Sequence, residues 1–457
     1  MSKNKKIIFF ELNEVPESIF VKSFNYLNCN VPLNQYDFIK TISCDECHLS
    51  PWTTWPTVHR GVTYSKHKIG DLGQDTQNAN KKYPPIWSVL QQKGLKVGVF
   101  GSLHSSQISY ELYENYSFFI PDIFSRDSFC HPKSYNSVQS LNLYLSRRSA
   151  RVVEKRFFPP FKRLFKAMYS YTITSFSFST VWSIFSQLIQ EKISPWKNIR
   201  RRTIQSDIMF DGYFRFFKKT KPDFSTFFTN HVASSMHRFW EASNPNDFKK
   251  LSHDQAWINK YENEISNSMK STFKYINKLT DFIDRNPEYE LWIISSMGQA
   301  PCEGYKPQKQ FWSITNLKIF LQNILNEEIS IEVGPSMIPL YSIYTNEETI
   351  KKLAKALSKI KTNVSIKLRT VTKSSLSFYF YSDEDNIFLN LNNVDISLEG
   401  LTLKQIKENT SSSAYHIPEG IFYRYGKNIE KIESKYFIDD YLPTDKIKEL
   451  VIKSLIK

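Results

Sequence analysis

The chain has 457 residues, of which 41% are hydrophobic and 23% are charged, and this balance excludes a wholly disordered protein. Its length suits one large core with insertions, or two to three average domains. The net charge is +15, and the five cysteines are scattered along the chain, which argues against a disulfide framework.

Near the N-terminus, lysines precede a short apolar run at 7–10, which ends at Glu11. This run is too short for the core of a signal peptide. We therefore expect a cytoplasmic protein, with peripheral attachment to the inner membrane surface as a further expectation.

Buried strands and helical segments alternate through most of the chain. We predict strands, in chain order, at 6–10, 38–43, 96–101, 223–229 and 290–294. Helices are predicted after Pro16, from the segment 50–61 to near Tyr64, at 87–93 and at 258–284. This alternation predicts an α/β fold with a mostly parallel central sheet and helices on both faces.

Polar clusters follow four of the predicted strands, after Phe10, Ser43, Thr229 and Ile294. In an open parallel sheet, ligands bind outside the carboxyl ends of the strands. We therefore expect the four clusters to converge on one site.

The segment 50–61 places hydroxyls, aromatic rings and prolines just before a helical pattern. A hydroxyl at the start of a helix lies beside unpaired N–H groups and the positive end of the helix dipole, where an anion is stabilised. Such a hydroxyl suits a nucleophile or a phosphate-binding group. The alternative is an ordinary N-cap, because threonine before proline commonly begins a helix.

Beyond residue 329 the pattern changes to shorter strands, at 364–370 and 376–381, around a helix at 346–360. We interpret this part as a small α+β cap subdomain, after which the motif 415–420 leads to a closing strand and a terminal helix. The predicted segments are the first part of the core at 1–140, a basic helical insertion at 141–203, the second part of the core at 204–328, the cap at 329–395 and the return to the core at 396–457.

The segment from Arg147 to Arg202 has 13 Lys or Arg and 2 Asp or Glu, so it carries +11 of the net charge. Within it, 167–190 is uncharged but has nine Ser or Thr and two Gln, which makes it too polar for a membrane span. Two interpretations stay open: an interfacial element on an anionic membrane surface, or a buried helical hairpin with a solvated basic rim. No nucleic-acid-binding motif accompanies the charge, so nucleic acid is not an expected partner.

Several landmarks follow one another in order along the chain. They are an acidic and polar turn after the first strand, Thr54-Trp55-Pro56 at a helix start, His237-Arg238-Phe239-Trp240, the Ser-x-x-Gly of 295–298 and the His-x-Pro-Glu-Gly of 416–420. In this order they resemble the alkaline phosphatase superfamily, especially its type I phosphodiesterase and nucleotide pyrophosphatase branch. The resemblance covers most of the chain outside the basic segment. No single landmark is specific, but their order is.

This resemblance implies two divalent metals about the hydroxyl of Thr54, which would attack phosphorus. The positions of the first metal correspond to Asn13, Thr54, Ser296 and Met297. This set has no carboxylate for a dication, so we expect that metal to be absent. Its loss removes several kcal/mol of transition-state stabilisation, so ordinary two-metal hydrolysis is not expected.

The positions of the second metal correspond to Asn230, His237 and His416, with His231 as a competitor of Asn230. Two imidazoles and one amide predict at most one weakly bound Zn or Mn, or no metal cofactor. A neighbouring glutamate, Glu11 or Glu14, is a candidate for a further carboxylate ligand.

These observations favour a divergent transferase that acts on a phosphorylated or nucleotide-linked sugar, by glycosyl or phosphoryl transfer, in surface polysaccharide biosynthesis. A lipid-linked acceptor and an anionic membrane surface are the further expected partners. The predicted catalytic residues are Glu11, Asn13, Glu14, Thr54 and His237. The predicted substrate-binding residues are Trp52, Thr53, His59, Asn230, His231, Arg238, Ser296, Gln299 and His416.

In this interpretation Glu11 or Glu14 acts as general base and Arg238 holds a phosphate. Thr54 is expected to hold a phosphate or sugar rather than to attack one. Two other functions stay open: a one-metal phosphodiesterase or nucleotide pyrophosphatase with Thr54 as nucleophile, and a non-catalytic scaffold that binds a phosphorylated ligand.

Overall fold

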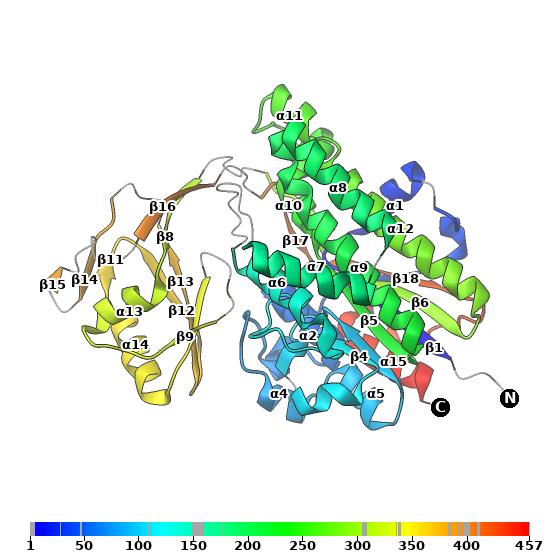
Figure 1. Ribbon diagram of the computed structural model, residues 1–457, viewed down its shortest axis with the longest axis horizontal. Helices are drawn as coiled ribbons and strands as arrows, with labels where there is room; N and C mark the ends of the chain where they lie inside the picture. The colour runs from blue at the N-terminus through cyan, green and yellow to red at the C-terminus, as the bar shows by residue number, and fades with distance from the viewer. Residues whose placement is uncertain are drawn as a thin grey trace.

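A computed structural model describes most of the chain. The described residues are 5–27, 29–45, 48–107, 110–148, 160–175, 177–303, 309–334, 336, 340–382, 384, 386–391, 394–395, 403–408 and 412–456. A larger unit holds a central sheet surrounded by helices, and a smaller unit lies beside it (Figure 1).

The larger unit is built on an eight-stranded sheet in the order β19-β2-β18-β6-β1-β5-β3-β4. The strands are β1 (Lys6–Leu12), β2 (Asp37–Ile42), β3 (Val97–Phe100), β4 (Phe118–Ile120), β5 (Phe224–Thr229), β6 (Tyr289–Ile294), β18 (Glu419–Tyr425) and β19 (Leu442–Pro443). Strand β18 runs antiparallel to β6 and β2, and the other pairs in the sheet are parallel. The predicted mostly parallel sheet is therefore confirmed, and the carboxyl ends of β1, β2, β5 and β6 share one edge.

Both faces of the sheet are covered, which explains why β1 reads as a continuous apolar run. Ile8 and Phe10 belong to the core on one face, whereas Ile7 and Phe9 belong to the core on the other. Residues of α9 and α12 complete the first core, and residues of α2, α5 and α15 complete the second.

The helices of the larger unit have these bounds: α1 (Glu17–Tyr26), α2 (Pro51–Arg60), α3 (Tyr64–His67), α4 (Gln77–Lys82), α5 (Ile86–Gln92), α6 (Asn136–Arg148), α7 (Phe161–Ser175), α8 (Phe178–Ile193), α9 (Arg201–Thr220), α10 (His231–Ser243), α11 (Gln255–Tyr261), α12 (Glu264–Arg285) and α15 (Ile447–Leu455). The helix predicted at 258–284 is thus two helices. The first of them, α11, packs on α10, where the rings of Trp257 and Tyr261 contact Phe239.

The smaller unit has its own core and a four-stranded antiparallel sheet in the order β12-β13-β10-β9. Its elements are β9 (Glu332–Val333), β10 (Leu340–Tyr344), β12 (Ser365–Val371), β13 (Ser375–Tyr381), α13 (Leu317–Leu325) and α14 (Glu347–Lys359). Two strands, β8 (Lys309–Ile314) and β16 (Leu403–Glu408), pair with each other where the chain enters and leaves this unit. The core includes side chains of α13, which precedes the predicted cap at 329–395. The division into five segments stays a prediction.

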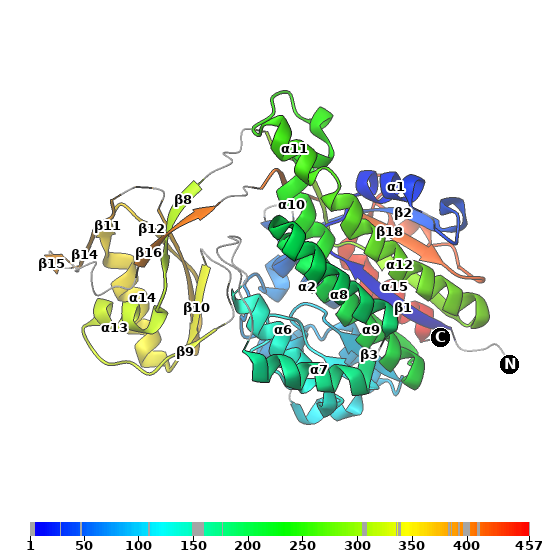
Figure 2. The ribbon, with the colours of Figure 1, turned by 45° about the horizontal axis from the view of Figure 1, so that its top comes forward.

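The basic segment contributes α7, α8 and the start of α9, and both α7 and α8 contact α9 (Figure 2). Large apolar side chains of α7 and α8 are exposed, so the predicted alternative of a buried hairpin is wrong. Among the described residues, no helix combines the length and apolarity needed to cross a membrane.

After β6 the chain passes under β18 and forms β7 (Gly298–Pro301), which pairs antiparallel with β17 (Ala414–Ile417). Two glycines make this crossing possible. A Cβ on Gly298 would lie 2.4 Å from the carbonyl oxygen of Glu419, and a Cβ on Gly420 would lie 2.6 Å from that of Ser295. The pairing places His416 opposite Gln299.

We expect Gly298→Ala to lower the free energy of unfolding by about 1–3 kcal/mol, because the added methyl group meets backbone rather than a movable side chain. Urea denaturation measures the change. An alanine variant as stable as the unchanged protein would show that the two crossing segments move apart without strain.

Candidate functional site

The turn after β1 brings an acidic side chain to the carboxyl edge of the sheet. Glu14 has a φ of 59°, in the left-handed region that non-glycine residues rarely adopt. This conformation costs about 1–2 kcal/mol, so the surrounding structure must impose it. Residues in such conformations concentrate at functional sites.

Two histidines from distant parts of the chain face the carboxylate of Glu14. His237 of α10 places Nε2 3.0 Å from Glu14 Oε2, and His416 of β17 places Nε2 3.3 Å from the same oxygen. The carboxylate is almost completely buried, whereas the imidazole side chains are 23% and 13% exposed. We call these three residues the Glu14 cluster.

Backbone carbonyls orient both imidazoles. Nδ1 of His237 donates to the carbonyl oxygen of Ala414 at 2.9 Å, and Nδ1 of His416 donates to that of Leu49 at 2.9 Å. Nε2 of each ring therefore faces Glu14, where it hydrogen-bonds the carboxylate and would become a metal ligand on losing its proton. The bond from Nδ1 to a backbone carbonyl is the outer hydrogen bond that metal-binding histidines usually make.

Amide side chains hold the carboxylate of Glu14 from the other side. Asn13 Nδ2 donates to Oε1 at 2.8 Å, and Gln299 Nε2 donates to Oε2 at 2.5 Å. Asn13 also donates to Asn230 Oδ1 at 2.7 Å and accepts from the indole N–H of Trp55 at 2.7 Å. The predicted convergence of polar residues from several strand ends therefore occurs around Glu14.

Charge balance in the cluster favours an ionised carboxylate. Burial by itself raises the pKa of Glu14, but the neighbouring charge of His416 and the hydrogen bonds with both imidazoles hold this pKa well below its usual value. Glu14 is therefore an anionic group in a mostly enclosed site.

The donor set of the Glu14 cluster fits a divalent metal. Two imidazole nitrogens and one carboxylate oxygen are the ligands of many catalytic zinc sites, which keep a further position for water or substrate. Zinc bonds of about 2.0–2.1 Å separate tetrahedral ligands by about 3.3 Å, close to the Glu14–histidine separations. Glu14, His237 and His416 each offer one ligand atom, and these atoms all lie within 4.8 Å of one another.

The residues at the positions of the other metal that the resemblance implies do not fit a metal ion. The hydroxyl of Thr54 bonds to Ser296 Oγ at 2.8 Å and to the carbonyl oxygen of Ser50 at 3.1 Å. Met297 is fully buried, and Thr54 has no exposed surface. This set contains no carboxylate for a dication, and the loss of that metal stays a prediction.

Glu11 lies on the opposite face of the sheet from the Glu14 cluster, because side chains alternate along β1 and it shares the face of Ile7 and Phe9. Its Oε1 is 2.9 Å from His59 Nε2 and accepts from Ser102 Oγ at 3.1 Å. Glu11 and His59 are both buried, and no described residue bonds the second oxygen of Glu11. The structure therefore does not bring these predicted site residues to the cluster.

His231 also points away from the cluster. Its ring bonds the hydroxyl of Thr229 at 2.6 Å and the carbonyl oxygen of Ser268 at 3.0 Å, and burial lowers its pKa to about 4. It therefore does not compete with Asn230 as a metal ligand. The remaining predicted residues lie on two helices, with Trp52 and Thr53 near the start of α2 and the buried Arg238 next to His237 on α10.

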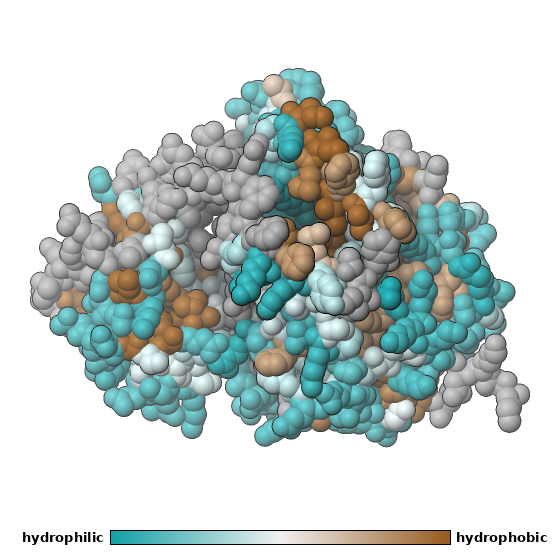
Figure 3. Space-filling model, viewed as in Figure 1, coloured by the Kyte–Doolittle hydropathy of each residue, from teal (hydrophilic) through white to brown (hydrophobic). Residues whose placement is uncertain are grey.

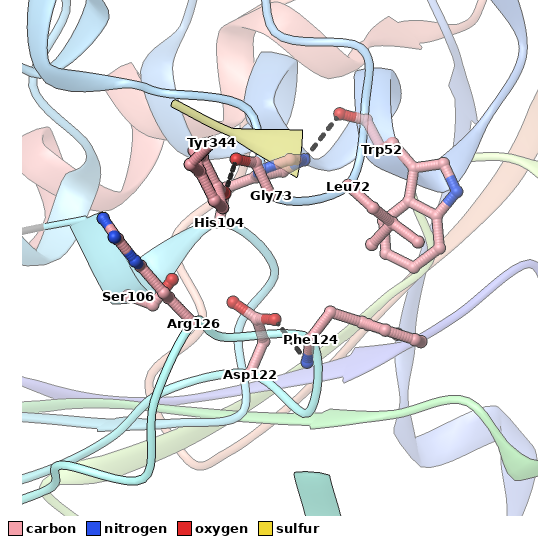
Figure 4. A pocket seen from close by; sticks show the side chains of 9 residues that line it. All are labelled: Trp52, Leu72, Gly73, His104, Ser106, Asp122, Phe124, Arg126 and Tyr344. Atoms are coloured by element: carbon pink, nitrogen blue, oxygen red, sulfur yellow. Dashed lines mark hydrogen bonds between the residues drawn. The ribbon is translucent and has the colours of Figure 1, made fainter. Parts of the chain in front are cut away.

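Sequence reasoning did not identify a pocket between the two units, although Trp52 belongs to it (Figure 4). The guanidinium of Arg126 lies 4.8 Å from the ring centre of Tyr344, whose hydroxyl donates to the carbonyl oxygen of Gly73. Burial raises the pKa of Asp122 to about 7. The lining residues are Trp52, Leu72, Gly73, His104, Ser106, Asp122, Phe124, Arg126 and Tyr344.

No known family model matches the chain, and no curated protein matches it. Among solved structures, the phosphonoacetate hydrolase of Sinorhizobium meliloti 1021 in complex with phosphonoformate is 10% identical, with a TM-score of 0.42 over 99% of this chain and 96% of that one. Murine ectonucleotide pyrophosphatase/phosphodiesterase 5 is 11% identical, with a TM-score of 0.39 over 99% and 95%. The alkaline phosphatase of the Antarctic bacterium TAB5 is 10% identical, with a TM-score of 0.39 over 99% of both chains. All three belong to the alkaline phosphatase superfamily, which the order of the sequence landmarks resembles.

Proposed function

We propose that this chain is a single-metal enzyme that moves a phosphoryl or glycosyl group from a phosphorylated or nucleotide-linked donor directly to an acceptor. The observation that carries the proposal is the Glu14 cluster, in which two oriented imidazoles and an ionised carboxylate meet at the carboxyl edge of the sheet.

Glu14, His237 and His416 would hold a single Zn²⁺ or Mn²⁺. When bound, such an ion polarises a phosphoryl or carbonyl-type oxygen and stabilises negative charge that develops on it. Asn13 and Gln299 keep the carboxylate in place through their amide N–H groups. Asn230 accepts from Asn13 through Oδ1, and we assign its amide N–H groups to a substrate oxygen.

Direct transfer, without a covalent threonine intermediate, follows from the placement of Thr54. Its hydroxyl is buried and already bonds two protein oxygens, and its position corresponds to a metal set that does not fit a metal. We therefore assign Thr54 to joining α2 to the end of β6, through Ser296, in place of the predicted contact with phosphate or sugar.

The transferase form of this proposal takes a nucleotide-linked sugar as donor and a lipid-linked acceptor, as in surface polysaccharide assembly. One feature supports it. The exposed apolar surface of α7 and α8 suits contact with lipid.

The test is a turnover assay of the full chain with Zn²⁺ or Mn²⁺ against nucleoside diphosphate sugars, each supplied with a lipid-phosphate acceptor, and against aryl phosphodiesters and aryl phosphomonoesters. Release of a nucleoside diphosphate identifies glycosyl transfer, and release of a nucleoside monophosphate identifies transfer of the sugar phosphate. Hydrolysis of the aryl diester alone would favour a one-metal phosphodiesterase. Ligand binding without turnover across the whole panel would contradict the proposal and favour a non-catalytic scaffold.

We expect Thr54→Val to keep kcat/KM within about tenfold of the unchanged protein, whereas removal of a true covalent nucleophile lowers it by about 10⁴-fold or more. Valine preserves the shape of the side chain but leaves Ser296 without its partner, at a cost of about 1–3 kcal/mol in stability. Turnover and urea denaturation are measured on the same preparation. A folded Thr54→Val protein that has lost more than about a thousandfold would restore Thr54 as nucleophile.

A further inference from the structure

An ordinary surface helix buries its apolar side chains and exposes its polar ones. Helix α8 does the opposite. The side chains that it buries are polar: Thr180, Gln187 and Glu191. Its exposed side chains include the apolar Phe178, Val181, Trp182, Phe185, Leu188, Ile189 and Ile193. The largest of these are far from covered, since Trp182 is 69% exposed and Phe178 is 80% exposed.

A polar network beneath α8 holds the helix in this orientation. Gln187 Nε2 donates to Glu191 Oε1 at 2.9 Å and to the carbonyl oxygen of Lys197 at 2.7 Å. The carboxylate of Glu191 is also paired with Arg201, through Nε at 2.9 Å and Nη2 at 2.6 Å. Rotating α8 to bury its apolar face would break this charge-assisted pair. The fold therefore holds the apolar face of α8 toward the outside.

Helix α7 extends the same surface. Phe165, Met168 and Tyr169 are exposed at the spacing of one helical face. In the space-filling view, hydrophobic side chains form a band along α8 (Figure 3). Contiguous apolar surface of this kind marks an interaction site with another protein or a membrane.

The charges around this surface are of one sign. Lys162 and Lys166 lie on the exposed stripe of α7 that contains Phe165, and Lys192 lies on that of α8. From 160 to 193 the sequence has one acidic residue, Glu191, which is buried against Arg201. The outward surface therefore offers apolar groups and ammonium groups together, which is complementary to the surface of an anionic bilayer.

We propose that α7 and α8 form a docking surface for an anionic lipid bilayer, on which both helices lie in the plane of the membrane interface. Trp182 and Tyr169 are the aromatic types that favour the headgroup level. The lysines extend their ammonium groups toward lipid phosphates while their aliphatic stems cover apolar surface. This inference does not depend on the Glu14 cluster or on the proposed reaction.

The experiment is co-flotation of the purified full chain with vesicles of phosphatidylcholine alone or with 30% phosphatidylglycerol, at low and high salt. We expect the protein to float with the anionic vesicles, and less so at high salt. The double variant W182E/F185E is expected to lose most of this binding. The double variant K166E/K192E should weaken binding to anionic vesicles by about fivefold or more for each lysine replaced, because each basic residue near an anionic surface strengthens binding by about that factor.

Phe388→Glu is the matched control, because this side chain is 53% exposed in the smaller unit. It should float like the unchanged protein. Thermal unfolding of every variant shows that a loss of binding is not a loss of folding, since the substituted side chains are exposed. The proposal is overturned if the unchanged chain stays unbound with anionic vesicles, or if W182E/F185E floats equally well.

Light scattering after size exclusion tests whether a second copy of the chain, instead of a membrane, covers the surface of α7 and α8. If the unchanged protein is a dimer that W182E/F185E converts to a monomer, and vesicles do not bind it, the surface is an interface between copies and the membrane proposal is wrong. A monomer that floats with anionic vesicles supports it.

Discussion

Replacing His416 with alanine is expected to lower the affinity for Zn²⁺ by about 100-fold or more and to reduce turnover below detection. Loss of an outer hydrogen bond to a metal ligand already costs about 10–100-fold, and His416 would supply a ligand atom itself. His237→Ala should behave in the same way, because both imidazoles present Nε2 to Glu14. Titration with Zn²⁺ after removal of metal by chelation measures the affinity.

His48→Ala is the matched control, because His48 is an exposed histidine that contacts Tyr64 rather than the Glu14 cluster. It should bind zinc with the affinity of the unchanged protein. Glu14→Gln keeps the shape of the side chain and removes its charge, so it should also weaken zinc binding. Equal affinity in all four variants, or no bound metal in the unchanged protein, would contradict a metal site and leave a histidine–carboxylate network without an ion.

The second large effect concerns Glu11 and His59, the buried pair on the face of the sheet opposite the Glu14 cluster. We expect His59→Leu to lower the free energy of unfolding by about 3–5 kcal/mol, because it leaves the carboxylate of Glu11 in the core without its partner. Glu11 already has one oxygen that bonds to no described residue. Urea denaturation of the variant and the unchanged protein measures the difference.

The double variant E11L/H59L separates a structural pair from a catalytic one. Replacing both members by apolar groups removes the uncompensated charge, so the double variant should be more stable than His59→Leu alone. Its zinc affinity should be unchanged, because the pair does not contact the Glu14 cluster. If Glu11→Gln instead folds normally and abolishes turnover, Glu11 is the general base that the sequence suggested.

The amino-acid pattern alone was sufficient to predict the central sheet. Continuous apolar runs such as 7–10 and 290–294 are typical of strands buried on both faces, and the polar residues that follow them mark one edge of the sheet. Coordination chemistry applied to Asn13, Ser296 and Met297 also predicts the loss of one metal site, because ligand type does not depend on the fold.

The pattern did not show which of two polar residues at the same strand end points into the core and which reaches the site. Glu11 and Glu14 are three positions apart, yet one points into the core beside His59 and the other reaches the two histidines. The alternation of side chains along β1 places Glu11 with Phe9, but Glu14 follows the strand in a left-handed conformation and its carboxylate bonds Asn13 and Gln299.

The resemblance already grouped His237 with His416, but the tertiary structure decided that Glu14 joins them and which face of α8 is exposed. His237 and His416 are brought together by the pairing of β17 with β7 and by backbone carbonyls of Ala414 and Leu49, all distant in sequence. The sequence of α8 indicates an amphipathic helix, but its rotation is set by the bond between Glu191 and Arg201. A helical pattern defines two faces, and only the partner against which the helix packs determines which of them is buried.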